Sequence, residues 1–342
     1  MAYTTINKPN TQMNTVLYTG NGGTQSITGV GFQPDWTWLK ARSESASHEL
    51  FDVVRGVTKT INSNTTNAEA TQADSLTAFG SDGFTLGSNG DINYNNSTYV
   101  GWNWKAGGTA SSNTDGSITS SVSANTTSGF SVVTFTGTGS NATIGHGLGV
   151  KPDAVFFKRL DTTGGWASYH SVLGATKYMR LDTNSGEQTA SDEFQNTEPT
   201  SSVISIGTDG AVNGTSMVAY CFAEKQGYSK FESYVGNGST DGPFIFTGFK
   251  PAFVLIKKSN ASGTDWQLTD NKRDLHNVCT HRLLPNDSIA EQTDSLDLDI
   301  LSNGFKIRKS STTSNASGAT YIYLAFAENP LVGTNNVPAT AR

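Results

Sequence analysis

One element occurs three times along the chain and limits its possible folds more than any other feature. Each copy has a β-branched or aromatic run, then Gly-x-Gly, then a proline that precedes a hydrophobic strand ending in lysine six positions later. Recurrence of this kind predicts a tandem array of one folding unit. The copies cover residues 18–40, 135–158 and 234–257, and an alternating strand follows each of them at 98–106, 216–224 and 320–328.

The composition predicts that this unit is a β-sandwich. Gly, Ser, Thr and Asn are abundant, charged residues make up 15% of the chain, and runs with helical hydrophobic spacing are almost absent. We predict an all-β fold of three tandem antiparallel β-sandwich (jelly-roll-like) repeats of about 95 residues, a size at which each can bury a core. The expected boundaries are 1–108 for repeat 1, 109–129 for a linker, 130–228 for repeat 2, 229–330 for repeat 3 and 331–342 for a C-terminal tail.

The predicted linker is nearly pure Gly, Ser, Thr and Asn from residue 106 to 129. Such a segment has too little apolar surface to fold alone, so we expect a linker, or an arm that pairs only on assembly. Repeats 2 and 3, by contrast, follow each other directly through residues 223–238. We therefore expect repeats 2 and 3 to form a close pair, with repeat 1 held more loosely.

The last strand of each repeat alternates large and small side chains. Alternate residues of a strand point to opposite faces of the sheet, so we expect the large residues to form the core of each sandwich. The strand after each proline is apolar on both faces in repeats 2 and 3, which is typical of a central strand covered on both sides. The large residues of the last strands are Val100, Trp102 and Trp104, then Val218, Tyr220 and Phe222, then Ile322, Leu324 and Phe326.

Charge and hydropathy argue against two classes of partner. The formal net charge is −6 and no Lys/Arg cluster is present, which argues against nucleic acid and anionic membranes. The apolar runs are too short to span a bilayer, and the N-terminus lacks the apolar core of a signal peptide. We expect a protein that is made in the cytoplasm and has no membrane insertion, with Cys221 and Cys279 reduced.

The sequence contains no convincing catalytic or cofactor motif. Residues 137–142 (GTGSNA) fit a dinucleotide fingerprint, but no helix pattern follows, so we interpret them as a turn. Asp294, Asp297 and Asp299 are candidate Ca²⁺ ligands, but Asp297 and Asp299 alternate with leucines, which is more simply explained as the solvent-facing side of a strand. The five histidines lack metal-site spacing, and no acidic pair recurs through the repeats. We expect a protein that is not an enzyme and has no cofactor or metal.

Aromatic residues are the remaining candidates for a binding site. Trp166 and Trp266 each follow a glycine-containing turn, 14 and 15 residues after the proline of their repeat. Exposed tryptophans provide flat apolar faces on which sugar rings stack, so these two are our candidate ligand-binding residues; packing inside the protein is the alternative. The other four tryptophans lie at alternating strand positions and are expected in the core.

Repeat 1 resembles a domain that is widespread in structural proteins of marine tailed bacteriophages, including those of cyanobacteria. The resemblance rests on the opening residues (MAYTTINKP…YTGNGGTQSITGVGFQPDWTWLK) and on residues 62–108. Repeats 2 and 3 carry it through the proline strand and the Phe-Ala-Glu strand, but lack the VRG, SDGFTLG and WNWKAGG strings in full. Such proteins are often described as tail-fibre-like, or as concanavalin-like sandwich repeats.

This resemblance implies a virion location and a non-enzymatic role. The first hypothesis is a tail fibre or receptor-binding appendage that attaches to host surface glycan. The alternative is a capsid decoration or fibre protein that binds other virion proteins, in the tail or the capsid. The absence of a coiled-coil or β-helical shaft pattern favours a compact knob or decoration, whereas the lack of an obvious capsid-clamping arm opposes it. In either role we expect a homo-oligomer.

Overall fold

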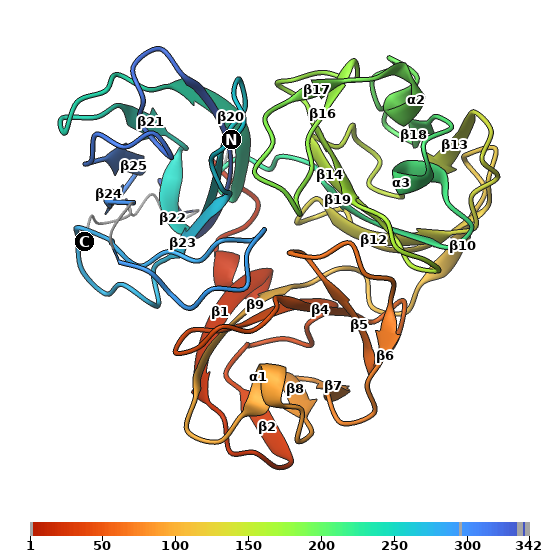
Figure 1. Ribbon diagram of the computed structural model, residues 1–342, viewed down its shortest axis with the longest axis horizontal. Coiled ribbons are helices and arrows are strands. Elements are labelled where there is room, and N and C mark those ends of the chain that lie inside the picture. The colour runs from red at the N-terminus through yellow and green to blue at the C-terminus, as the bar shows by residue number, and fades with distance from the viewer. Residues whose placement is uncertain (1–2, 294–295, 334–337, 339–342) are drawn as a thin grey trace.

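The computed structural model describes residues 3–293, 296–333 and 338, and its strands form antiparallel sheets, which confirms the predicted all-β fold (Figure 1). In these described ranges no helix is long and apolar enough to cross a membrane. The helices are single turns: η1 (Pro9–Thr11), α1 (Gly90–Asn93), α2 (Ser191–Phe194) and α3 (Gly210–Asn213).

Unit one, residues 13–104, has a large sheet and a small sheet packed face to face. The large sheet has the strand order β1-β9-β3-β4-β5-β6, and the small sheet has the order β2-β8-β7. The bounds are β1 (Met13–Thr19), β9 (Thr98–Trp104), β3 (Trp36–Ala41), β4 (Glu49–Asp52), β5 (Lys59–Asn62) and β6 (Ala70–Thr71), with β2 (Gln25–Thr28), β8 (Gly83–Leu86) and β7 (Leu76–Gly80).

Unit two, residues 111–222, has the same plan with an extended edge. Its large sheet has the order β10-β11-β12-β19-β14-β15, and two small sheets, β13-β18 and β16-β17, complete it. The bounds are β10 (Ser111–Asn113), β11 (Ser120–Asn125), β12 (Phe130–Phe135), β19 (Met217–Phe222), β14 (Ala154–Arg159), β15 (Trp166–His170), β13 (Ala142–Gly145), β18 (Val203–Ile206), β16 (Lys177–Tyr178) and β17 (Gln188–Thr189).

Unit three, residues 229–330, is the simplest of the three. A four-stranded sheet of order β20-β26-β22-β23 faces a three-stranded sheet of order β21-β25-β24. The bounds are β20 (Ser229–Val235), β26 (Thr320–Pro330), β22 (Phe249–Lys258) and β23 (Gln267–Asp270), with β21 (Phe244–Phe246), β25 (Gly304–Ile307) and β24 (Leu298–Leu301). Of the predicted tail 331–342, residues 334–337 and 339–342 lie outside the described residues.

The segment predicted to be a linker forms strands, so that prediction is wrong. β11 pairs along its whole length with β12, and β10 pairs with β11. Val122 of β11 is buried in the interior of unit two. Few apolar side chains are needed here, because the edge of an existing sheet supplies the backbone hydrogen-bond partners.

The Gly-x-Gly motif is a tight turn clamped by a buried asparagine, as the turn interpretation predicted. In unit one a side chain on Gly20 would lie 2.2 Å from the carbonyl oxygen of Tyr94, and Gly22 has φ +70°. Only glycine tolerates both demands. The Asn93 side chain accepts a hydrogen bond from the Asn21 N–H (2.9 Å) and donates to the Gly23 carbonyl (2.6 Å). Asn213 and Asn315 hold the corresponding turns of units two and three.

Each unit encloses its own core between its large and small sheets, but this core is not lined by the bulky face of the last strand. On β9 the residue facing the interior is Gly101, where an added Cβ would lie 2.9 Å from Leu39 Cδ2. On β19 the inward residues are Ala219 and Cys221. In units one and two, small residues of the last strand therefore face the sandwich interior, whereas in unit three Tyr321 and Tyr323 face it together with Ala325 and Ala327.

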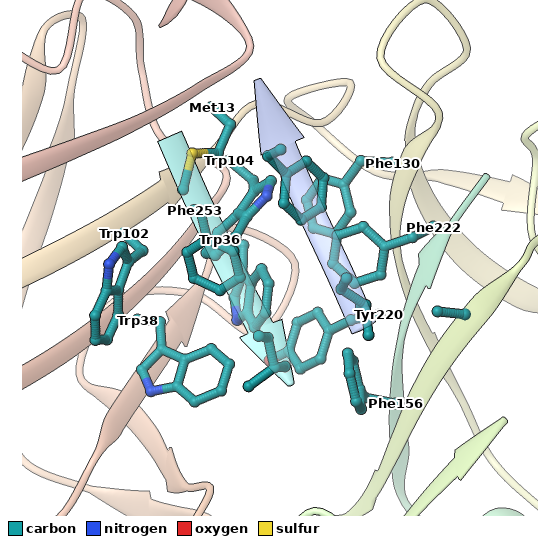
Figure 2. Close-up of a cluster of buried hydrophobic side chains, with 14 of the residues drawn as sticks. Met13, Trp36, Trp38, Trp102, Trp104, Phe130, Phe156, Tyr220, Phe222 and Phe253 are labelled. Atoms are coloured by element: carbon teal, nitrogen blue, oxygen red, sulfur yellow. The ribbon is translucent and has the colours of Figure 1, made fainter. Parts of the chain in front are cut away.

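The bulky faces form a fourth core that all three units share, which corrects the prediction that they fill separate sandwiches. All six tryptophans belong to this core, together with large residues from the big sheets of every unit. Figure 2 shows Trp36, Trp38, Trp102 and Trp104 beside aromatic residues of units two and three. The alternation in sequence shows which face of the strand carries the large side chains, but both faces of these strands are buried. Sequence alone does not reveal which buried face meets another unit.

The three units are arranged around a common centre, with the small sheets β2-β8-β7, β13-β18 and β21-β25-β24 on the outside (Figure 1). At the centre meet the equivalent residues Trp104, Phe222 and Phe326, one from each unit. Their ring centroids are 6.4, 5.6 and 5.7 Å apart for the pairs Trp104–Phe222, Trp104–Phe326 and Phe222–Phe326. Unit one therefore packs on both neighbours, and the expectation that it is held loosely is wrong.

We predict that Trp104→Ala lowers the free energy of unfolding by about 3–5 kcal/mol, because it leaves a cavity where three units meet. Urea denaturation followed by circular dichroism measures this loss. The control is Leu275→Ala, which removes a side chain that is 68% exposed and should change the stability by about 0.5 kcal/mol or less. A loss confined to one of several separate transitions would contradict the shared core.

Candidate functional site

The structure places both candidate ligand-binding tryptophans inside the protein. Trp166 and Trp266 are 0% and 1% exposed and lie in the shared core. The indole N–H of Trp166 donates to the Asn62 carbonyl of unit one, and that of Trp266 donates to the Arg180 carbonyl of unit two, both at 2.9 Å. Neither ring can stack on a sugar, so the prediction of an exposed aromatic platform at these residues is wrong.

These tryptophans mark the boundaries where two units meet, which we call the seams. Trp166 pairs in register with Lys158, and Trp266 adjoins Gln267, the partner of Ile256, which precedes Lys257. In unit one the corresponding residue is His48, whose Nε2 lies 3.0 Å from the Leu284 carbonyl of unit three. His48 Nδ1 accepts the indole N–H of Trp38 at 2.8 Å, so Nε2 carries the proton and donates across the seam. Burial lowers the pKa of His48 well below its ordinary value.

The lysine of each repeated element is buried and forms a hydrogen bond across a seam. Its ammonium donates to one carbonyl of its own unit and to one of the neighbouring unit. Burial lowers the pKa of each of these lysines to about 8. The bonds across the seams run from Lys40 to Ser288 (3.2 Å), from Lys158 to Thr66 (3.2 Å) and from Lys257 to Asn184 (3.4 Å).

Backbone hydrogen bonds reinforce every seam at two equivalent places. The carbonyls that receive the lysines also accept an amide from the neighbouring unit. In the opposite direction, the carbonyl two residues beyond each lysine accepts a hydrogen bond from a backbone amide of the neighbouring unit. The first set is Ala46 N to Ser288 O (2.9 Å), Gly164 N to Thr66 O (2.8 Å) and Gly263 N to Asn184 O (2.9 Å); the second is Glu291 N to Arg42 O (2.9 Å), Glu69 N to Leu160 O (2.9 Å) and Glu187 N to Ser259 O (2.7 Å).

Two seams also contain a buried aspartate–arginine pair. Asp270 of unit three accepts the indole N–H of Trp102 from unit one (3.0 Å) and the guanidinium of Arg273 (2.6 Å). Burial alone would raise the pKa of Asp270, but the charge and hydrogen bonds of Arg273 outweigh it and hold that pKa below its ordinary value. Asp52 similarly accepts the hydroxyl of Tyr220 from unit two at 2.8 Å.

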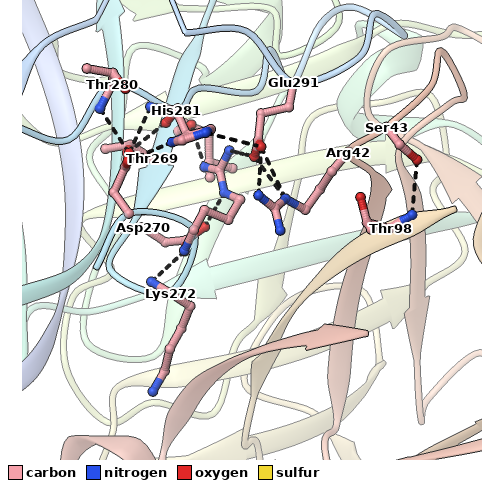
Figure 3. Close-up of polar contacts among 12 residues, drawn as sticks. Arg42, Ser43, Thr98, Thr269, Asp270, Lys272, Thr280, His281 and Glu291 are labelled. Carbon is pink, nitrogen blue, oxygen red and sulfur yellow. Dashed lines mark hydrogen bonds and ion pairs between the residues drawn. The ribbon is translucent and has the colours of Figure 1, made fainter. Parts of the chain in front are cut away.

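An ion-pair network closes the outer part of the seam between units one and three (Figure 3). Glu291 bridges Arg42 of unit one (2.8 Å) and Arg273 of unit three (2.9 Å). Burial raises the pKa of Glu291, but the two guanidinium groups more than offset this and hold it below its ordinary value. Packing between units therefore explains the shifted pKa values of Asp270 and Glu291.

The aspartates considered as calcium ligands lie on the wet side of a strand. Asp297 and Asp299 alternate with buried leucine and isoleucine residues, and they pair with Lys309 (3.9 Å) and Arg308 (3.4 Å). Asp294 lies outside the described residues. Among the residues that the structure describes, no group of three His, Cys, Asp or Glu side chains is arranged to hold a metal ion.

An open polar groove lies where units one and two meet, with a volume of about 590 Å³. Asp35 lines it and accepts the Gly108 N–H at 3.2 Å, and Asn125 donates to the Gln12 side chain at 2.8 Å. Gln33 and Lys105 contribute further hydrogen-bonding groups. Sequence reasoning missed this groove because its lining comes from four separate segments with no shared motif.

We predict that stability rises with pH between about 8 and 10 because of the seam lysines. In the unfolded chain a lysine keeps its proton until about pH 10.4, whereas these three release theirs near pH 8 when folded. The unfolded state then binds more protons, so the free energy of unfolding increases with pH. Urea denaturation should show a rise of about 5 kcal/mol from pH 7.5 to 9.5, or just under about 2 kcal/mol for each lysine.

The matched variants are Lys158→Met, which should reduce this pH dependence, and Lys8→Met, at an exposed lysine, which should leave it unchanged. An identical pH dependence in Lys158→Met would contradict the role assigned to burial.

Comparison with known proteins gives a family and no further relatives. No curated protein and no solved structure matches the chain. A family model described as "Domain of unknown function (DUF7483)" matches residues 8–330, a range that includes all three units. The chain therefore belongs to this family.

Proposed function

We propose that the protein is a non-enzymatic structural protein of a bacteriophage virion surface that binds other virion proteins, as a capsid decoration or fibre component. The resemblance of repeat 1 to structural proteins of marine tailed phages supports the virion location. The geometry supports the protein-binding role over attachment through tryptophan platforms.

The observation that carries this choice is the burial of all six tryptophans in the shared core. Sugar-binding sandwiches present aromatic rings at the surface, whereas this chain uses them to lock its units together. Among its exposed large apolar residues, two phenylalanines lie close together on β21. A rigid protein with a polar surface and few exposed apolar residues can make many weak contacts in parallel when several copies lie on one particle. Avidity then replaces a single tight binding site.

A second candidate is attachment to host surface glycan, as a tail fibre or receptor-binding appendage. The polar groove between units one and two favours it, because Gln33, Asp35 and Asn125 offer the carboxylate and amide groups that hydrogen-bond sugar hydroxyls. The groove lacks an aromatic face, so a sugar there would be bound through hydrogen bonds alone.

Locating the protein in intact particles tests the proposal. We expect cryo-electron microscopy, with labelling by antibodies raised against the purified chain, to place it on the capsid or along a fibre in contact with neighbouring virion proteins. A position only at the distal tip of a tail fibre, combined with binding on a glycan array that Asn125→Ala abolishes, would favour the second candidate. Absence of the protein from purified particles would contradict both.

A further inference from the structure

Strand β21 of unit three presents an unusual outer edge. Phe244 and Phe246 are 45% and 55% exposed, and they alternate with Ile245, which is buried in the interior of unit three. β21 is the outer strand of the order β21-β25-β24, and in the described part of the chain no further strand adds to it (Figure 1). Edge strands usually carry charge or a covering segment to prevent pairing, and two exposed aromatic rings do the opposite.

The same position in the other units carries small residues. Ile245 pairs with Phe305, as Ile27 pairs with Phe84 in unit one and Ile144 pairs with Ile204 in unit two. The alignment sets the two phenylalanines against Ser26 and Thr28 in unit one, and against Thr143 and Gly145 in unit two. The exposed aromatic pair therefore belongs to unit three alone.

Unit two shows how a chain segment occupies this edge. The Thr143 carbonyl accepts the N–H of Ile118 at 3.0 Å, and the Thr143 N–H donates to Ser117 Oγ at 2.9 Å. The backbone groups of Thr143 thus point away from β18, toward the free edge. Because Phe244 has the same register position, its N–H and carbonyl point outward as well, where they can pair with another strand.

We propose that β21 pairs antiparallel with β21 of a second copy of this chain, about a two-fold axis at Ile245. In this register Phe244 lies opposite the partner subunit's Phe246, and Phe246 lies opposite the partner subunit's Phe244. Both backbone groups of each phenylalanine are then hydrogen-bonded, and all four rings lie on one face of a continuous six-stranded sheet. The pattern is complementary to itself, as a two-fold interface requires.

The charges around β21 permit this pairing. Lys306, which lies opposite Phe244 on β25, pairs with Asp241 of the same copy at 2.8 Å and donates to the Gly242 carbonyl at 2.9 Å. Its charge is therefore balanced within each copy and does not repel the partner. A three-residue strand buries little area, so we expect a dimer that dissociates on dilution rather than a permanent one.

The test compares the wild-type chain with the double variant Phe244→Ser, Phe246→Thr, which installs the residues of unit one. Sedimentation equilibrium from about 1 to 200 µM should show a monomer–dimer equilibrium for the wild type and an association at least about ten-fold weaker for the variant. Tyr94→Ser removes an aromatic side chain that is 59% exposed in unit one, and it should associate like the wild type. Circular dichroism checks that all three proteins are folded.

Hydrogen exchange supplies a second readout. Amide exchange in β21 should slow as the wild-type concentration rises, and should not do so in the double variant. A wild-type chain that stays monomeric throughout would overturn the proposal, even if it binds an extended segment of another protein. Equal association of the wild type and the double variant would overturn it too, whatever the place of the protein in a virion.

Discussion

The structure depends on one hydrophobic core that belongs to no single unit. Three large sheets turn their bulky faces toward a common centre, and Trp104, Phe222 and Phe326 close it. Burial of large aromatic side chains is the largest favourable contribution to the free energy of folding that a chain with so few charged residues can make. The arrangement is that of a ring of three sandwiches covalently linked in one chain.

The seams show how a polar sequence tolerates so much burial between its units. The lysines, indoles and amides described above as crossing the seams each have a carbonyl or carboxylate partner on the other side, and the lysine and amide contacts recur at equivalent places in all three units. Buried polar groups cost most when they are left unpaired, so these contacts reduce the cost of burial and fix the orientation of the units, although burial still disfavours the charged form of each lysine. Burial at the seams also accounts for the lowered pKa values of His48 and of the lysines.

Much of the fold was predictable from the sequence, because turns and alternation are local signals. The Gly-x-Gly turns and the central proline strands lie where the repeated element predicted them. The buried positions of Trp166 and Trp266 at the seams were not predictable, because their hydrogen-bond partners Asn62 and Arg180 lie in other units. The lysine closing an apolar strand in every copy was the available sign of a shared interface, because an isolated lysine there would be costly to bury.

Differential scanning calorimetry tests the shared core most directly. If the core is common to all units, the chain melts in a single transition whose calorimetric and van't Hoff enthalpies agree, as they do for any protein that unfolds as one cooperative unit. Two or three resolved transitions, or a van't Hoff enthalpy near one third of the calorimetric value, would show that the sandwiches unfold independently and would contradict the account.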